Sequence, residues 1–235
     1  MAKTEQPRAG VLIPAAGQGR RLGGEPKQYR FLGGLSVLER TLEVFQKCDD
    51  VSHIVVASRP SDCDDLAARF QQCGFDRVVA VIPGGATRQD SVRNALRALP
   101  LDANPVLVHD AVRPFVTSAV IRAVVRAALK YGSAAPAIAV TDTLRERRAA
   151  VFGATVPRDG LVRMQTPQAF RREVIEEAFA RTGDAVATDD VELVQRAGFE
   201  VRIVDGNAAN IKITTPDDWR LARVLWGSGW EDRES

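Results

Sequence analysis

The sequence predicts a three-layer α/β sandwich built on a mostly parallel sheet. Three observations lead to this prediction: short runs rich in Val, Ile and Leu recur along the chain, segments of helical length lie between them, and the two kinds alternate. Strands that are apolar throughout are typical of a parallel sheet whose two faces are covered by helices. The 235 residues are expected to form a single domain, 1–235.

The elements follow from apolar periodicity and from helix-capping residues. Seven strands are expected, at 11–14, 53–58, 77–83, 105–110, 136–140, 201–206 and 211–214. Seven helices are expected, at 36–47, 62–72, 87–98, 118–130, 171–181, 189–197 and 216–226. Ser36 and Glu39 have the spacing of a capping box at the first helix. Thr215 and Pro216 form a favourable start for the last one.

One region departs from the alternation. The stretch "TDTLRERRAAVFGATVPRDGLVR" (141–163) mixes polar and apolar residues without a sustained helical stripe. It is expected to form an extended β-hairpin arm with its turn near Phe152–Gly153. Long excursions of this kind from a compact domain are often functional.

Composition excludes several classes of protein. Hydrophobic residues make up 45% and charged residues 26% of the chain, and the net charge of +2 is too balanced for a sequence-independent nucleic-acid binder. No apolar run is long enough to predict a membrane span, and no export leader is recognisable. Cys48, Cys63 and Cys73 form no CxxC pair, so neither a zinc site nor a disulfide framework is predicted. Reduced thiols in the cytoplasm are the expectation.

The stretch "VLIPAAGQGRRLGGEPKQY" (11–29) indicates an anion site. It does not match a dinucleotide fingerprint, because Leu22 stands where the third glycine belongs, and it does not match a Walker loop, because Lys27 is followed by Gln28. Glycine amides form a concave nest for anions, and Arg20, Arg21 and Lys27 add charge, which favours polyphosphate. A solvated basic surface loop is the alternative.

Further motifs occur in a recognisable order: "GGATRQDSV" (84–92), "VHDAVRPFV" (108–116), "TDTLR" (141–145), "QTPQAF" (165–170), "ATDDVELV" (187–194) and "NIKITTPDD" (210–218). With the glycine loop, they resemble the 2-C-methyl-D-erythritol 4-phosphate cytidylyltransferase family of the non-mevalonate isoprenoid pathway. The resemblance covers about residues 10–225. It implies a Rossmann-like sheet of the nucleotide-diphospho-sugar transferase type. It also implies transfer of the cytidylyl group of CTP to 2-C-methyl-D-erythritol 4-phosphate, giving 4-diphosphocytidyl-2-C-methyl-D-erythritol and pyrophosphate.

The resemblance also implies roles for individual residues. The catalytic cations would be Arg21, Lys27, Arg158 and Lys212. The nucleotide would be held by Ala15, Ala16, Gly17, Gly19, Gly84, Gly85, Arg88, Ser91, Asp110 and Ala111. The sugar phosphate would be held by Arg113, Thr143 and Thr166, and Mg²⁺ by Asp110. A phosphate monoester is largely dianionic at neutral pH, so such a nucleophile needs charge neutralisation and positioning rather than a general base.

Other expectations and alternatives remain open. His109 is expected to be a packed or orienting histidine. Asp189 and Asp190 are expected to cap a helix, and a second metal role is the weaker alternative for them. Ala86 stands where some relatives carry Asp, which leaves base selectivity open. The family's homodimers interlock through their arms, so Thr143 and Arg158 are expected to reach a neighbouring subunit. The alternatives are a ribitol 5-phosphate cytidylyltransferase, another sugar-phosphate nucleotidyltransferase, or a non-catalytic nucleotide-binding module.

Overall fold

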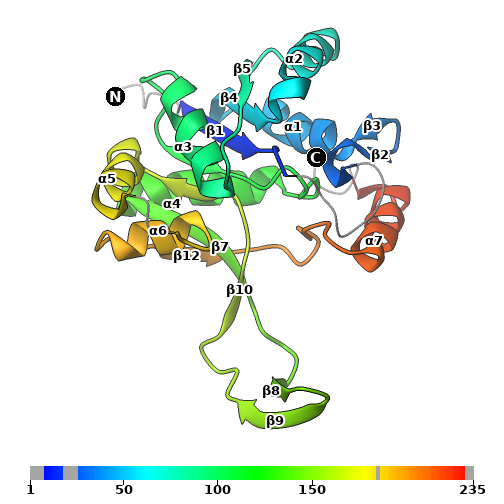
Figure 1. The fold of residues 1–235 in the computed structure, drawn as a ribbon, viewed down its shortest axis with the longest axis vertical. Coiled ribbons are helices and arrows are strands. Elements are labelled where there is room, and N and C mark those ends of the chain that lie inside the picture. Colours follow the sequence, from blue (N-terminus) through cyan, green and yellow to red (C-terminus); the bar gives the residue numbers. More distant parts are fainter. Residues whose placement is uncertain (1–7, 18–25, 184–185, 231–235) are drawn as a thin grey trace, which may run out of the picture.

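The structure, a computed structural model, describes residues 8–17, 26–183 and 186–230. Figure 1 shows a layered body of helices and strands from which one long hairpin extends. The main sheet contains β1 (Ala9–Pro14), β4 (Val51–Ser58), β5 (Val78–Pro83), β6 (Val106–Val108), β7 (Ser133–Ala139), β10 (Val162–Met164), β11 (Gln168–Phe170) and β12 (Arg202–Asp205). Two short pairs lie outside it: β2 (Phe31–Leu32) with β3 (Leu35–Ser36), and β8 (Leu144–Arg148) with β9 (Val151–Val156).

The helices lie between these strands in the chain. They are α1 (Val37–Lys47), α2 (Cys63–Gln72), α3 (Arg88–Ala98), α4 (Ser118–Tyr131), α5 (Arg172–Thr182), α6 (Asp190–Arg196) and α7 (Pro216–Gly227). Two 3₁₀ turns, η2 (Lys27–Tyr29) and η3 (Pro60–Asp62), complete the described elements. All seven predicted helices are confirmed to within one residue at each end. The predicted capping box at Ser36 and Glu39 is also present.

The sheet has the strand order β10-β7-β11-β6-β1-β4-β5, and β12 pairs with β7. Strand β1 is parallel to both of its neighbours, β4 and β6, and β5 is parallel to β4. Strand β11 is antiparallel to β6 and β7, and β10 is antiparallel to β7. The prediction of a mostly parallel sheet is therefore confirmed, with one antiparallel stretch next to β6.

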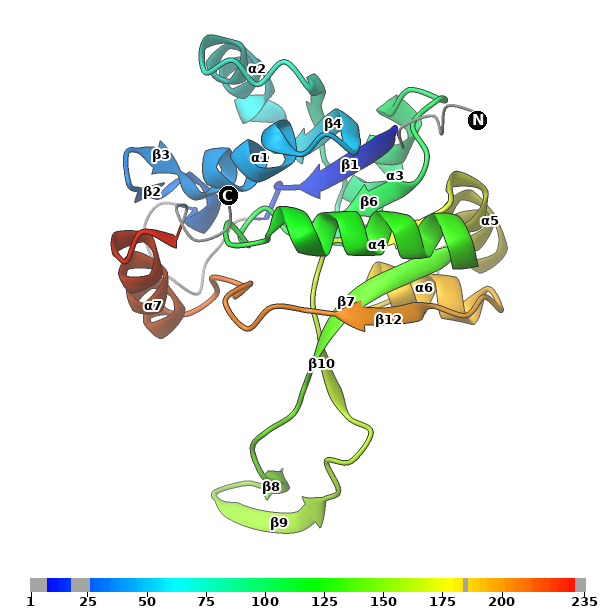
Figure 2. The same cartoon turned by 180° about the vertical axis from the view of Figure 1, so that it is seen from behind.

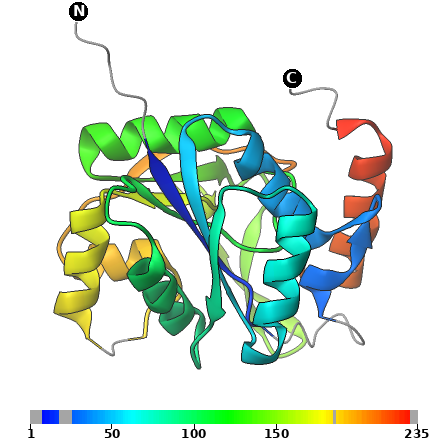
Figure 3. The same ribbon diagram turned by 90° about the horizontal axis from the view of Figure 1, so that it is seen from above.

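Successive side chains of the central strands enter two separate cores. Val11 and Ile13 of β1 pack in one cluster with α1, α2 and α4, whereas Leu12 packs in the other with α3, α5 and α6. This alternation is expected for a strand with a period of two that is covered on both faces. Figure 3 shows the helices on either side of the sheet. The three-layer prediction is confirmed.

Two details of the sequence prediction are wrong. Residues 211–214 form no strand, because Ile213 is buried beneath α7 and its N–H donates to the Val112 carbonyl (3.0 Å) without a ladder. The arm turns at Ala149–Ala150 rather than at Phe152–Gly153, because Arg148 pairs with Val151 in the β8–β9 ladder. The extended hairpin itself is confirmed, and Figures 1 and 2 show it leaving the body beyond β7 and β10.

None of the helices in the described ranges is long and apolar enough to cross a bilayer.

Candidate active site

The site lies where the parallel strands end. The strand order reverses at β1, because the chain runs from β1 outward through β4 and β5 and then returns to β6 on the other side of β1. Ligands of open α/β sheets bind in the crevice at such a switch point. The segments that follow β1 and β6 both line a cavity of about 250 Å³ at this position.

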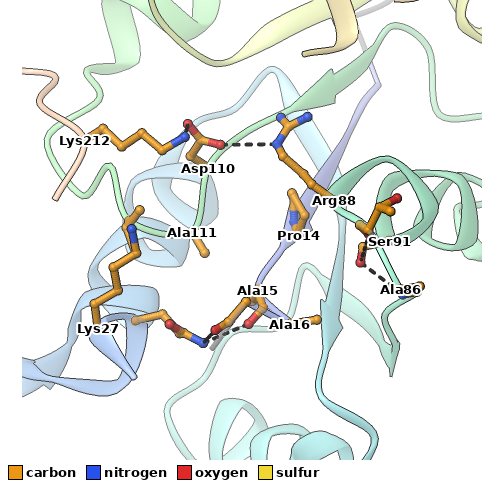
Figure 4. Close-up of a pocket in the computed structure, with 15 residues that line it drawn as sticks. Pro14, Ala15, Ala16, Lys27, Ala86, Arg88, Ser91, Asp110, Ala111 and Lys212 are labelled. Atoms are coloured by element: carbon orange, nitrogen blue, oxygen red, sulfur yellow. Dashed lines mark hydrogen bonds and ion pairs between the residues drawn. The ribbon is translucent and has the colours of Figure 1, made fainter. Parts of the chain in front are cut away.

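We call this cavity the glycine-loop pocket. Its lining residues are Pro14, Ala15, Ala16, Gly17, Lys27, Gln28, Gly85, Ala86, Thr87, Arg88, Ser91, Asp110, Ala111, Val112 and Lys212. Lys27 and Lys212 come from distant parts of the chain, and Figure 4 shows both reaching toward the same space, with Asp110 and Arg88 beside Lys212. Cations from two separate segments therefore converge on one cavity.

A second cavity of about 270 Å³, which we call the Thr166 pocket, adjoins the first. Its lining residues are Arg88, Asp110, Arg113, Met164, Gln165, Thr166, Gln168, Thr188, Asp189 and Lys212. Three of them, Arg88, Asp110 and Lys212, also line the glycine-loop pocket. The two cavities thus meet at a charged junction, an arrangement suited to two ligands that react with each other.

The backbone after β1 is held by a buried side chain. Gln28 Nε2 donates to the carbonyls of Ala15 (2.9 Å) and Gly17 (2.8 Å), and only 3% of Gln28 is exposed. The neighbouring turn approaches so closely that it requires glycine: a Cβ on Gly84 would lie 2.6 Å from the Ala16 Cβ. The wall of the glycine-loop pocket is therefore fixed by packing and hydrogen bonds.

The start of α3 forms the opposite wall. Thr87 caps the helix by accepting from the Asp90 N–H, and Arg88 is the first helical residue. Ser91 Oγ accepts from the Gly85 N–H (3.0 Å) and donates to the Thr87 carbonyl (2.9 Å). The Ser91 hydroxyl thus shapes the turn, in addition to lining the pocket.

Asp110 is the centre of charge in the site. Lys212 Nζ lies 3.0 Å and Arg113 Nε 3.1 Å from its Oδ2, and Arg88 Nε lies 3.5 Å from its Oδ1. Burial opposes ionisation of this carboxyl, but the charges of Lys212, Arg88 and Arg113 outweigh it and hold its pKa well below the ordinary range. Asp110 is therefore a carboxylate at neutral pH.

His109 is a packed histidine, as expected. It is completely buried, and burial lowers its pKa to about 3. Thr166 Oγ1 lies 3.0 Å from its Nδ1, and the Arg113 carbonyl lies 3.1 Å from its Nε2. Thr166 Oγ1 also accepts from the Asp110 N–H (3.2 Å). Because its imidazole is neutral and both its nitrogens are engaged, His109 fixes the backbone around Asp110.

The two aspartates at the start of α6 differ. Asp189 is a cap, as expected, because its Oδ1 accepts from the Glu192 N–H (2.8 Å). The prediction that Asp190 also caps is wrong: its buried carboxylate lies 2.8 Å from Arg88 Nη1. Burial raises the pKa of Asp190, and the charge of Arg88 opposes that effect. Asp190 belongs to the charged junction through Arg88.

The structure brings most of the predicted site residues together. Those that line one or both pockets are Ala15, Ala16, Gly17, Lys27, Gly85, Arg88, Ser91, Asp110, Ala111, Arg113, Thr166 and Lys212. Gly84 lies directly behind Ala16 and Ser91. Gly19 and Arg21 lie outside the described residues.

Two predicted residues stand apart. Thr143 and Arg158 are exposed on the arm, where Arg158 donates to the Thr141 carbonyl, and neither lines the two pockets of its own chain.

Sequence reasoning missed Gln28, Gln165 and Asn210. Asn210 is fully buried. Its Nδ2 donates to the Thr166 main-chain carbonyl (2.8 Å), and the main-chain carbonyl of Asn210 accepts from Arg113 Nη1 (2.7 Å). Gln165 Nε2 donates to the Asn207 carbonyl (2.7 Å). Gln165 and Asn210 hold the irregular segment that leads to Lys212, whereas Gln28 holds the backbone after β1. In the sequence, each of these three residues is visible only as an amide side chain within a motif, and an amide alone does not indicate which partner it binds.

Comparison with known proteins identifies the family. The family profile described as 2-C-methyl-D-erythritol 4-phosphate cytidylyltransferase matches residues 9–227. The chain belongs to this family. A protein of that name from Salinibacter ruber is 53% identical over 224 residues, covering 94% of each chain. One from Dehalococcoides mccartyi is 39% identical over 223 residues, covering 94% of this chain and 97% of its own.

Solved structures agree. The crystal structure of 2-C-methyl-D-erythritol 4-phosphate cytidylyltransferase from Thermus thermophilus is similar to this chain with a TM-score of 0.77 and 37% identity, over 94% of this chain and 99% of the other. The resemblance predicted from the motifs is confirmed, and with it the nucleotidyltransferase class of fold.

Proposed function

We propose that this member of the cytidylyltransferase family transfers the cytidylyl group of CTP to 2-C-methyl-D-erythritol 4-phosphate and releases pyrophosphate. The observation that carries the proposal is the convergence of Lys27, Lys212 and Asp110 on one cavity that continues into a second. CTP would occupy the glycine-loop pocket and the sugar phosphate the Thr166 pocket. The acceptor oxygen then meets the α-phosphorus at the shared junction.

The residues at the junction suit phosphoryl chemistry that depends on charge. The acceptor phosphate is already anionic near neutral pH and attacks without giving up a proton, so no general base is needed. In agreement, His109 beside the site is buried and neutral. Lys27 would stabilise charge on the α-phosphoryl group, and Lys212 and Arg113 would hold the acceptor phosphate. The family resemblance implies the same role for Arg21.

Mg²⁺ is proposed to enter with the nucleotide. No group of three or more His, Cys, Asp or Glu side chains within the described ranges could hold a metal ion. Asp110 supplies one ionised carboxylate at the pocket wall. Mg²⁺ commonly uses one or two carboxylates together with substrate phosphates and water, so this donor set fits it. When bound, the ion would neutralise phosphate charge.

A homodimer is proposed to complete the site. Thr143 and Arg158 lie on the arm, away from the pockets of their own chain, and the arm carries Val151 and Phe152 with 66% and 84% of their surfaces exposed. Exposed apolar residues at the tip of a long hairpin favour contact with a second copy. In that assembly the arm would deliver Thr143 and Arg158 to the partner's Thr166 pocket.

The test is pyrophosphate release by the purified protein with CTP, Mg²⁺ and 2-C-methyl-D-erythritol 4-phosphate. Ribitol 5-phosphate in a parallel reaction tests the nearest alternative, and UTP in place of CTP tests whether Ala86 relaxes base selectivity. We expect turnover with the methylerythritol phosphate at least about 100-fold above that with ribitol 5-phosphate, since a site that pairs polar groups with one substrate rejects an analogue strongly. Absence of turnover at micromolar enzyme would overturn the proposal.

The proposed location is the cytoplasm. All three cysteines are free in the structure, consistent with a reducing compartment.

A further inference from the structure

The start of α6 places a carboxylate where the helix does not require one. Asp189 already caps α6, and the N–H groups of Asp190 and Val191 donate to Gln168 Oε1 (3.1 Å each). The Asp190 side chain is therefore free of any capping duty, and only 2% of it is exposed. Its carboxylate lies 2.8 Å from Arg88 Nη1 across the interface with α3.

A buried carboxylate in an ion pair usually contributes little net stability, because desolvation offsets the attraction between the charges. The Asp190–Arg88 pair is better explained by the position that it gives to the Arg88 guanidinium. Arg88 stands between two carboxylates, and its Nη1 lies closer to Asp190 (2.8 Å) than its Nε lies to Asp110 (3.5 Å). About a third of the Arg88 side chain (31%) stays exposed, at the wall that both pockets share.

We propose that Asp190 is a positioning residue that holds the Arg88 guanidinium at the junction of the two pockets. Arg88 forms ion pairs with both Asp190 and Asp110, and the other partners of Asp110 are Lys212 and Arg113. The planar, five-donor guanidinium can face both carboxylates and still offer N–H groups to a phosphate, which a lysine ammonium cannot do.

This inference rests on the proposed function for its ligand, because it concerns Arg88 in a site for CTP and Mg²⁺. The test is a double-mutant cycle of Asp190→Asn and Arg88→Ala, read as the CTP·Mg²⁺ dissociation constant by titration calorimetry and as kcat/KM for pyrophosphate release. Asp190→Asn keeps the shape of the side chain and removes its charge. We expect it to lower kcat/KM about 10- to 100-fold and to weaken CTP·Mg²⁺ binding, as loss of one charged contact does.

The coupling between the two substitutions decides whether Asp190 acts through Arg88. If Asp190 acts through Arg88, the double variant loses no more than Arg88→Ala alone, to within about two-fold. Additive losses would overturn the proposal, as would an Asp190→Asn variant within about two-fold of the wild type. Glu177→Gln, which removes a carboxylate paired with Arg181 on the surface of α5, is the matched control and is expected to change neither readout.

Two further measurements separate positioning from folding and from the proposed function. Arg88→Lys leaves Asp190 intact and keeps the positive charge, but it removes the planar guanidinium that can contact two carboxylates at once. We expect this variant to lose at least about 10-fold in kcat/KM. Full activity of Arg88→Lys would overturn the proposal even if Asp190→Asn fails to fold. If the wild type binds CTP·Mg²⁺ but does not turn over the methylerythritol phosphate, the proposed acceptor is wrong. In that case the double-mutant cycle, read as the CTP·Mg²⁺ dissociation constant, still tests the role of Asp190.

Discussion

The body and the arm of this protein use charged residues in opposite ways. In the body, Arg88, Asp110 and Lys212 are joined by ion pairs, and Asp110, the partner that the two cations share, is buried. On the arm, the run Leu144–Arg148 carries charges that lie in solvent, and the arm's apolar residues are exposed as well. The body thus builds its part of the site by its own folding. The described residues of the arm belong to none of the buried hydrophobic clusters, and the proposed dimer would give them a second surface to pack against.

The largest expected effect comes from a substitution in the body, at Lys27 in the glycine-loop pocket. Lys27→Ala should lower kcat about 10²- to 10³-fold, because the proposed mechanism places this cation against charge that develops in the transition state. CTP affinity should change by less than about 10-fold, since other contacts in the glycine-loop pocket remain. Lys47→Ala, an exposed lysine paired with Glu43 on α1, is the control. Normal turnover by Lys27→Ala would remove Lys27 from the mechanism.

The next prediction sharpens the role of the arm. In the proposed dimer, Lys212→Ala would damage the part of the site formed by the body and Arg158→Ala the part formed by the arm, so each variant alone should be nearly inactive. If the arm serves a neighbouring copy, an equal mixture after exchange should recover about a quarter of wild-type activity, because half of the dimers then hold one intact site of two. The measurement is pyrophosphate release before and after mixing. No recovery after verified exchange would place Arg158 in the site of its own chain.

A smaller effect concerns stability in the body. The native pKa of His109 is about 3, whereas an unfolded histidine titrates near 6.5. The unfolded state therefore binds the extra proton first as pH falls, and the free energy of unfolding should decrease between pH 6.5 and about 3, by up to ~1.4 kcal/mol per pH unit. His109→Gln should flatten this slope in urea titrations from about pH 6.5 to about pH 4.5. Equal slopes for the wild type and for His109→Gln would contradict the assignment.

The smallest expected effect lies at the tip of the arm. Ala149 has a φ of 52°, a conformation that costs a residue with a Cβ about 1 kcal/mol or more. Ala149→Gly should therefore slow hydrogen exchange of the β8–β9 amides a few-fold without changing the midpoint of global unfolding. A lowered global midpoint would mean that the arm and the body unfold together.

Sequence reasoning succeeded where local pattern and physical requirement coincide. The helices follow from apolar periodicity and caps such as Ser36 with Glu39, and the glycine loop follows from the need for close backbone approach to anions. It failed where tertiary packing decides. The apolar residues on either side of Lys212, Ile211 and Ile213, pack in the hydrophobic cluster beneath α7 and not in a sheet. Asp190 resembles a cap because nothing in the local sequence shows that Arg88 lies opposite.

The strand by which the arm returns to the body has a practical consequence. Strands β10 and β11 both pair with β7, and Gln165 and Thr166 lie between them in the wall of the Thr166 pocket. The root of the projection is therefore also part of the chamber in which the acceptor would bind. Anyone shortening the hairpin to test the proposed dimer must cut well outside Met164–Phe170, because a deletion that reaches this stretch would remove the wall of the Thr166 pocket together with the arm.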